Sequence, residues 1–149
     1  MLNKHHEQYQ EKIISLWVVF LLGLLFHTQL GLMPLFHGLN IITSQSKNMA
    51  EIAPIMWLML TFFVLPMAAI IGTVFTNSRG YRTIHFGFTV LYSMLNLSHL
   101  IADIMVETDL YQILLMAILF TIGLLINLVS WQWMRDRSHR STHQHLPQT

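Results

Sequence analysis

The sequence predicts an all-α integral membrane protein, a bundle of four transmembrane helices with both termini in the cytoplasm. Of its 149 residues, 54% are hydrophobic and only 10% are charged, and the mean hydropathy is +0.52. Soluble domains carry about 25% charged residues, so this composition indicates a membrane protein. Two further observations support the prediction: the chain has four long stretches without charged residues, and its basic residues gather on one side of them.

The uncharged stretches are Ile13–Phe36, Ile52–Thr76, Thr83–Ala102 and Leu110–Met134. Each reaches the roughly 20 residues that a helix needs to span a bilayer. We therefore expect one bundle with spans at about residues 13–34, 52–76, 83–106 and 110–134. A polar lead-in over residues 1–12 precedes them, and a disordered cytoplasmic tail over residues 135–149 follows.

The first, second and fourth spans each contain residues that predict how they pack. Gly23, His27 and Gly31 recur every four residues in the first span, which lets another helix approach closely. Pro66 lies inside the second span and should bend it, because proline has no N–H to donate to the preceding turn. Gly123, Asn127 and Ser130 share one face of the fourth span. The connections on either side of the third span are short, so the second, third and fourth spans should be antiparallel neighbours.

The orientation follows from the basic residues. Seven of the eight lysines and arginines lie at the ends that we assign to the cytoplasm, and only Lys47 lies on the opposite side. Aromatic residues agree with this assignment as expected interface anchors: Trp17, Tyr81, Trp131 and Trp133 on the inner side, Trp57 and Tyr111 on the outer side.

The third span carries a polar stripe along its whole length. Its members are His85, Thr89, Tyr92, Asn96, His99, Asp103 and Glu107, at spacings of four, three, four, three, four and four. These positions fall within an arc of about 80° on one helix face. Polar groups in hydrocarbon are costly, so the stripe should face protein, water or a bound ion.

The outer half of the bundle contains the residues that we consider the best candidates for a metal, haem or proton site. His27 and His99 have similar depths on parallel spans, and Asp103 follows one turn after His99. His37, Glu51 and Glu107 could form the rim of such a site. Two or three imidazoles with one or two carboxylates suit a divalent transition metal such as zinc, copper or iron. Two alternatives remain open: the histidines could be the axial ligands of a b-type haem, or the cluster could handle a proton.

The inner half of the stripe offers a candidate proton path. His85, Thr89, Tyr92 and Asn96, together with Asn127 on the fourth span, could connect the outer cluster to the cytoplasm. The alternative is an ordinary hydrogen-bonded interface between helices, and this half of the stripe favours that alternative.

These patterns predict a small membrane protein with an outer-face site for a proton, a metal ion or haem, acting as a redox, transport or assembly subunit. The alternative is a structural scaffold subunit whose stripe only packs helices. The expected partners are the lipid bilayer and either further copies of the chain or other membrane subunits; a net charge of +1 gives no reason to expect nucleic acid. The sequence has no recognisable nucleophile–base motif, so we do not expect catalysis by the chain alone.

Overall fold

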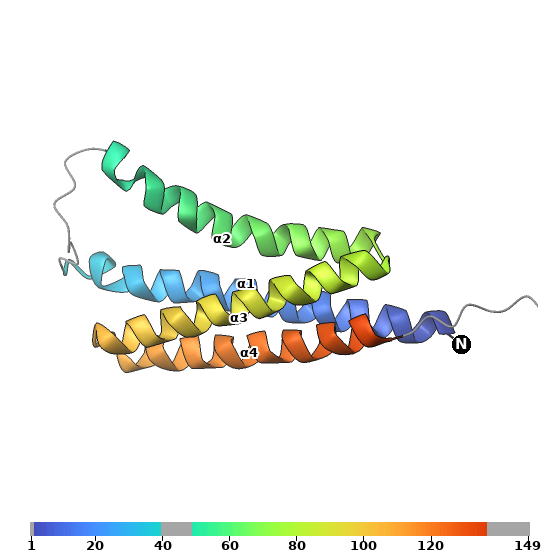
Figure 1. Ribbon diagram of the computed structural model, residues 1–149. Helices are drawn as coiled ribbons and strands as arrows, with labels where there is room; N and C mark the ends of the chain where they lie inside the picture. The colour runs from blue at the N-terminus through green and yellow to red at the C-terminus, as the bar shows by residue number, and fades with distance from the viewer. Residues whose placement is uncertain (1, 40–48, 137–149) are drawn as a thin grey trace, which may run out of the picture.

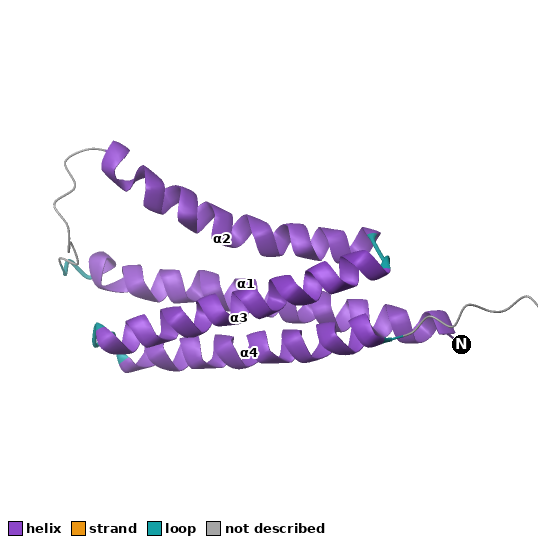
Figure 2. Cartoon of the chain, viewed as in Figure 1, coloured by secondary structure: helices purple, strands orange, loops and turns teal. Residues whose placement is uncertain are grey.

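The computed structural model describes residues 2–39 and 49–136, and almost all of them are helical. Helix α1 is Leu2–Phe36, α2 is Met49–Phe75, α3 is Arg79–Met105 and α4 is Leu110–Arg135 (Figure 1). Within the described residues there is no strand (Figure 2). All four helices are long and apolar enough to cross a membrane, so the chain is a multi-pass membrane protein. Residues 40–48 of the predicted outer loop and residues 137–149 of the predicted tail lie outside the described residues.

Helix α1 begins at Leu2, so the polar residues of the expected lead-in continue the helix and extend beyond the rest of the bundle (Figure 1). Near this end, the Gln10 side chain donates a 2.7 Å hydrogen bond to the carbonyl of Thr73 on α2. The Thr73 carbonyl lies in the last turn of α2, where it has no partner within its own helix. The polar beginning of α1 therefore also caps the end of α2.

Helix α4 is the centre of the packing, and it lies closest to α3 and α1. Small residues allow these approaches: a Cβ added at Gly23 on α1 would lie 2.5 Å from the Leu119 side chain, and one at Gly123 would lie 3.1 Å from Ser93 Oγ. In lipid, the hydrophobic effect does not drive helices together, so close packing of this kind drives their association instead. The Gly23 and Gly123 faces predicted from the sequence are thus the faces at which the helices meet.

Helices α2, α3 and α4 run antiparallel in turn as expected, with α3 against α4, but the backbone of α2 lies closest to α1 and diverges from the bundle towards Met49 (Figure 1). The tight turn after α2 still holds its other end against α3. There, Tyr81 Oη donates to the carbonyl of Ala69 at 2.7 Å, and its ring fits against Gly72. Short connections fix only the ends of consecutive helices. Further along, α2 meets α3 through side chains such as Tyr92, whose ring centroid lies 5.0 Å from that of Phe62.

The expected anchor roles of Trp17 and Trp133 are wrong. Both side chains are buried inside the bundle, at 1% and 0% exposure. Trp17 packs edge-on against Phe20 and Tyr92, with ring centroids 5.6 Å apart in each pair. Tryptophan is common at interfaces because its N–H needs a partner. Trp17 has its partner inside the bundle, in His85, whereas the buried Nε1 of Trp133 has no hydrogen-bond partner among the described residues.

Arg82 joins the turn before α3 to the end of α4. Its buried guanidinium donates to both the side chain and the backbone carbonyl of Asn77 and to the carbonyls of Trp133 and Asp136. The last carbonyls of a helix lack partners and favour a cation. From the sequence, Arg82 served only to predict the orientation in the membrane. In the structure, its planar guanidinium also donates hydrogen bonds to the end of α4.

We expect the Arg82→Lys variant to lose about 1–3 kcal/mol of unfolding free energy, because an ammonium group cannot reach all these acceptors at once. Denaturant unfolding in micelles measures this loss. The matched control is Arg135→Lys, where the arginine is exposed and should change stability by less than about 0.5 kcal/mol. Equal stability of the two variants would show that the Arg82 bonds contribute nothing.

Candidate functional site

The polar stripe of α3 faces the other helices over most of its length. Its first four members are buried, at 2% exposure for His85, 1% for Thr89, 4% for Tyr92 and 3% for Asn96. Towards the end of α3 the stripe becomes more accessible: the side chain of His99 is 53% exposed and that of Asp103 14%. The stripe therefore faces inward as predicted, except that His99 and Glu107 near its end are exposed.

His85 has a hydrogen-bond partner at each of its two ring nitrogens. Trp17 Nε1 donates to His85 Nε2 at 3.2 Å, and His85 Nδ1 lies 3.2 Å from Ser130 Oγ. An indole N–H can only donate, so Nε2 must carry no proton in this arrangement. In the neutral ring the proton is then on Nδ1, where it is donated to Ser130. Both ring nitrogens of His85 are thus occupied by partners on α1 and α4.

Tyr92 closes a gap that proline leaves in α2. Its hydroxyl donates to the carbonyl of Phe62 at 3.0 Å. Phe62 is four residues before Pro66, and a residue with an N–H at position 66 would have occupied that carbonyl. An unpaired carbonyl is expensive in a membrane, so Tyr92 replaces the missing helical bond.

We expect Tyr92→Phe to lower the unfolding free energy by about 0.5–1.5 kcal/mol, the usual value of one such bond. The Pro66→Ala change supplies the missing N–H, so in that background Tyr92→Phe should cost close to nothing. A double-mutant cycle in denaturant measures this difference. If Tyr92→Phe costs the same in both backgrounds, the tyrosine does not act through the Phe62 carbonyl.

The other members of the predicted proton path also bond locally. Thr89 Oγ1 donates to the carbonyl of Phe86 in its own helix, and Asn127 Nδ2 donates to Ser93 Oγ at 2.8 Å. Asn127 therefore meets α3 at Ser93. Among the described hydrogen bonds, none connects one member of the predicted path to the next. The path remains a prediction, while the bonds are those of a helix interface.

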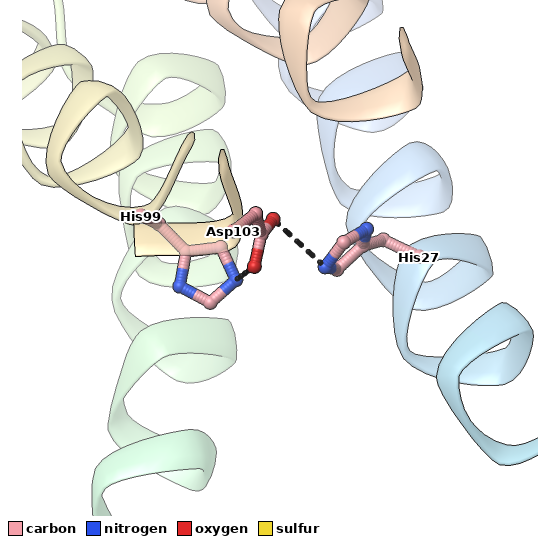
Figure 3. A network of polar contacts seen from close by, with 3 residues as sticks. All are labelled: His27, His99 and Asp103. Atoms are coloured by element: carbon pink, nitrogen blue, oxygen red, sulfur yellow. Dashed lines mark ion pairs between the residues drawn. The ribbon is translucent and has the colours of Figure 1, made fainter. Parts of the chain in front are cut away.

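At the predicted outer end, His27 from α1 meets His99 and Asp103 from α3 (Figure 3). His27 Nε2 lies 3.7 Å from Asp103 Oδ2, and His99 Nε2 lies 3.8 Å from Asp103 Oδ1. The carboxylate lies between the two rings, whose centroids are 5.5 Å apart. One candidate ligand atom from each residue lies within 4.8 Å of the other two. Residues 72 positions apart in the chain thus form one cluster, because α1 and α3 run in the same direction and their side chains meet.

The distances in this cluster suit an ion better than direct hydrogen bonds. An N–H···O bond needs about 2.7–3.2 Å, and both contacts to Asp103 are longer. Two atoms that share one zinc ion, each at about 2.1 Å, are at most about 4.2 Å apart, and both contacts to Asp103 satisfy this limit. The three ligand atoms together lie within 4.8 Å of one another, so zinc binding would draw them slightly closer. Asp103 Oδ2, the oxygen that faces His27 Nε2, is buried and has no hydrogen-bond partner among the described residues. Polar groups without partners in such a place indicate an ion, a water molecule or a ligand.

The three expected rim residues do not belong to this cluster. His37 lies in the turn after α1, Glu51 in the first turn of α2 and Glu107 after α3, and all three side chains are exposed. Glu107 has a positive φ of 56°, which fits its place in the tight turn between α3 and α4. Their contribution to a site remains a prediction.

A cavity of about 210 Å³ adjoins the cluster between α1, α2 and α3, with Met116 of α4 as a further wall residue. Its lining is mostly apolar and comprises Leu24, His27, Thr28, Leu58, Met59, Phe62, Phe63, Asn96, His99 and Met116. Four of its residues come from α2, the helix that diverges from the bundle (Figure 1). Sequence periodicity could not locate this cavity, because it depends on the tilt of α2.

Comparison with known proteins adds no further assignment. No protein-family model, no curated protein and no solved structure matches this chain.

Proposed function

We propose that this membrane protein binds one divalent transition metal ion between α1 and α3, through His27, His99 and Asp103. The observation that carries the proposal is the spacing of these groups, which is too long for direct hydrogen bonds and suited to a shared ion. Two imidazoles and one carboxylate are a ligand set used for zinc and for ferrous iron.

The ion would keep a coordination position for another ligand. The chain offers three ligands, and tetrahedral zinc takes four. The cavity beside His27 and His99 leaves room for a water molecule or another small ligand at the fourth position. Such a position is typical of zinc sites that do chemistry, whereas structural zinc sites are closed by four protein ligands.

Haem is supported less well than a single ion. In a site with two axial histidines, the porphyrin plane must lie between the imidazoles. Here the Asp103 carboxylate lies in that space, within 3.8 Å of both rings. A haem would have to displace a carboxylate that belongs to the cluster.

A fixed metal centre is also better supported than a transport route. A route across the bundle would need polar groups that can exchange partners along α3. Instead, His85, Tyr92 and Thr89 each hold a specific partner that stabilises the fold. The scaffold alternative therefore describes the inner half of the stripe, and the metal site is at its outer end. Among redox, transport and assembly roles, this arrangement favours a bound centre in a membrane redox or assembly subunit.

The test is metal binding by the purified full-length chain in micelles. After chelation, zinc and cobalt are titrated in separately, with elemental analysis of the dialysed complex. We expect one ion per chain, and the visible bands of tetrahedral cobalt. A red protein with a Soret band would instead show that the histidines hold haem. A colourless, metal-free protein that stays folded would overturn the proposal in favour of the scaffold.

A further inference from the structure

The cavity between α1, α2 and α3 has a polar feature that the metal proposal does not use. Asn96 lines the cavity and is only 3% exposed, yet its Nδ2 atom is buried without a hydrogen-bond partner among the described residues. A buried amide N–H without an acceptor costs about 1–3 kcal/mol, so such a group is normally satisfied by water or a ligand. The Asn96 amide is therefore an unpaired hydrogen-bond donor in the wall of the cavity.

The residues that line the cavity around Asn96 are mostly apolar and aromatic, which favours an apolar ligand with a ring. Phe62 and Phe63 contribute aromatic faces from α2, and Leu24 contributes an aliphatic wall from α1. Aromatic side chains favour aromatic partners through offset and edge-on contacts. An apolar cavity of about 150 Å³ is enough for one benzene ring, so the cavity here, at about 210 Å³, admits one ring with a small substituent.

The cavity is accessible from the lipid side. Leu58 and Met59 belong to its lining, and their exposures are 66% and 43%. Both residues belong to the first half of α2, the helix that diverges from the bundle (Figure 1). A compound dissolved in the membrane can therefore enter between α2 and its neighbours without crossing water.

We propose that this cavity binds a small aromatic carbonyl compound taken up from the membrane, with its oxygen accepting a hydrogen bond from Asn96 and its ring between Phe62, Phe63 and Leu24. The carbonyl supplies the acceptor that the amide lacks, and the ring matches the apolar walls. A water molecule would also satisfy Asn96, but it would leave most of the apolar cavity unfilled.

Binding at this cavity does not depend on the proposed metal site, because Asn96 is not a member of the His27–His99–Asp103 cluster. Binding is therefore tested on chelator-treated protein, and the absence of metal binding would not affect the result. A ligand in the cavity would nevertheless lie beside the two imidazoles that line it. If both sites are occupied, the ion and the carbonyl compound would be neighbours.

The experiment compares two probes of the same shape in nanodiscs that hold the full-length chain. Acetophenone has the carbonyl oxygen, and α-methylstyrene has a CH₂ group in its place. Equilibrium dialysis gives the affinity of each, with the Leu24→Trp variant as the baseline for partition into lipid. The control for that variant is Leu22→Trp, whose side chain is exposed on the same helix and is not part of the lining.

We expect wild type to bind acetophenone about 3- to 10-fold more tightly than α-methylstyrene, the ratio that one hydrogen bond supplies. Asn96→Leu keeps the volume and should remove this preference while both probes still bind. In the infrared spectrum, the carbonyl stretch of bound acetophenone should shift to lower wavenumber in wild type and not in Asn96→Leu. Equal affinity for the two probes, a preference that survives Asn96→Leu, or binding no greater than in Leu24→Trp would each overturn the proposal.

Discussion

Replacing Asp103 by asparagine is expected to lower the affinity for zinc by at least about 100-fold. Changes to groups that only support metal ligands already cost about 10- to 100-fold, and Asp103 would itself be a ligand. It lies within 3.8 Å of both imidazoles, so its loss removes the group that the two histidines share. Asparagine keeps the shape but is a neutral and weaker ligand. Isothermal titration with zinc measures the change.

The matched control is Glu107→Gln, the same kind of charge removal one turn further along the chain. Glu107 is exposed and outside the cluster, so the variant should bind zinc as wild type does. An equal loss in both variants would mean that zinc responds to charge at this end of the protein and not to the proposed site. The same Asp103→Asn protein in proteoliposomes tests the proton alternative, which predicts a pH-driven flux that this change stops.

The Trp17→Ala variant is expected to lose about 3–5 kcal/mol of unfolding free energy. Trp17 is 1% exposed and contacts rings on both α1 and α3, so its removal leaves a large void at the centre of the bundle. It also leaves His85 Nε2 without its donor. Denaturant unfolding in micelles measures the loss.

Two companion variants separate packing from hydrogen bonding. Trp17→Phe keeps much of the ring volume and should lose less, about 1–3 kcal/mol, mainly from the unpaired His85 nitrogen. Trp57→Ala removes a tryptophan that is 68% exposed and should change stability by less than about 1 kcal/mol. The account of the core would be wrong if Trp17→Ala were no more damaging than Trp57→Ala.

The sequence predicted those features that depend on one helix at a time. The length of the uncharged stretches predicted four apolar helices, and the alternating spacing of four and three residues between polar side chains predicted the inward face of α3. The meeting of His27 with His99 and Asp103 was predicted from their similar depth on two helices, and it is observed because α1 and α3 run in the same direction and their side chains meet.

Features that depend on how neighbouring helices are ordered and tilted were not predictable. Trp17 lies at a span end in the sequence, and nothing there indicates that His85 would accept its N–H. The role of Tyr92 likewise requires knowing that the Phe62 carbonyl, released by Pro66, faces α3. Periodicity gives the direction of a side chain from its own helix axis, but it does not give the order or tilt of the neighbouring helices.

X-ray absorption at the zinc edge tests most directly whether the bundle holds an ion between α1 and α3. For the zinc-loaded wild type, we expect two imidazole nitrogens and oxygen ligands at about 2.0–2.2 Å. One imidazole should disappear from the spectrum when His27→Ala is loaded at high zinc, and the His37→Ala spectrum should match wild type. Zinc surrounded only by water oxygens, or a spectrum that His27→Ala leaves unchanged, would contradict the account.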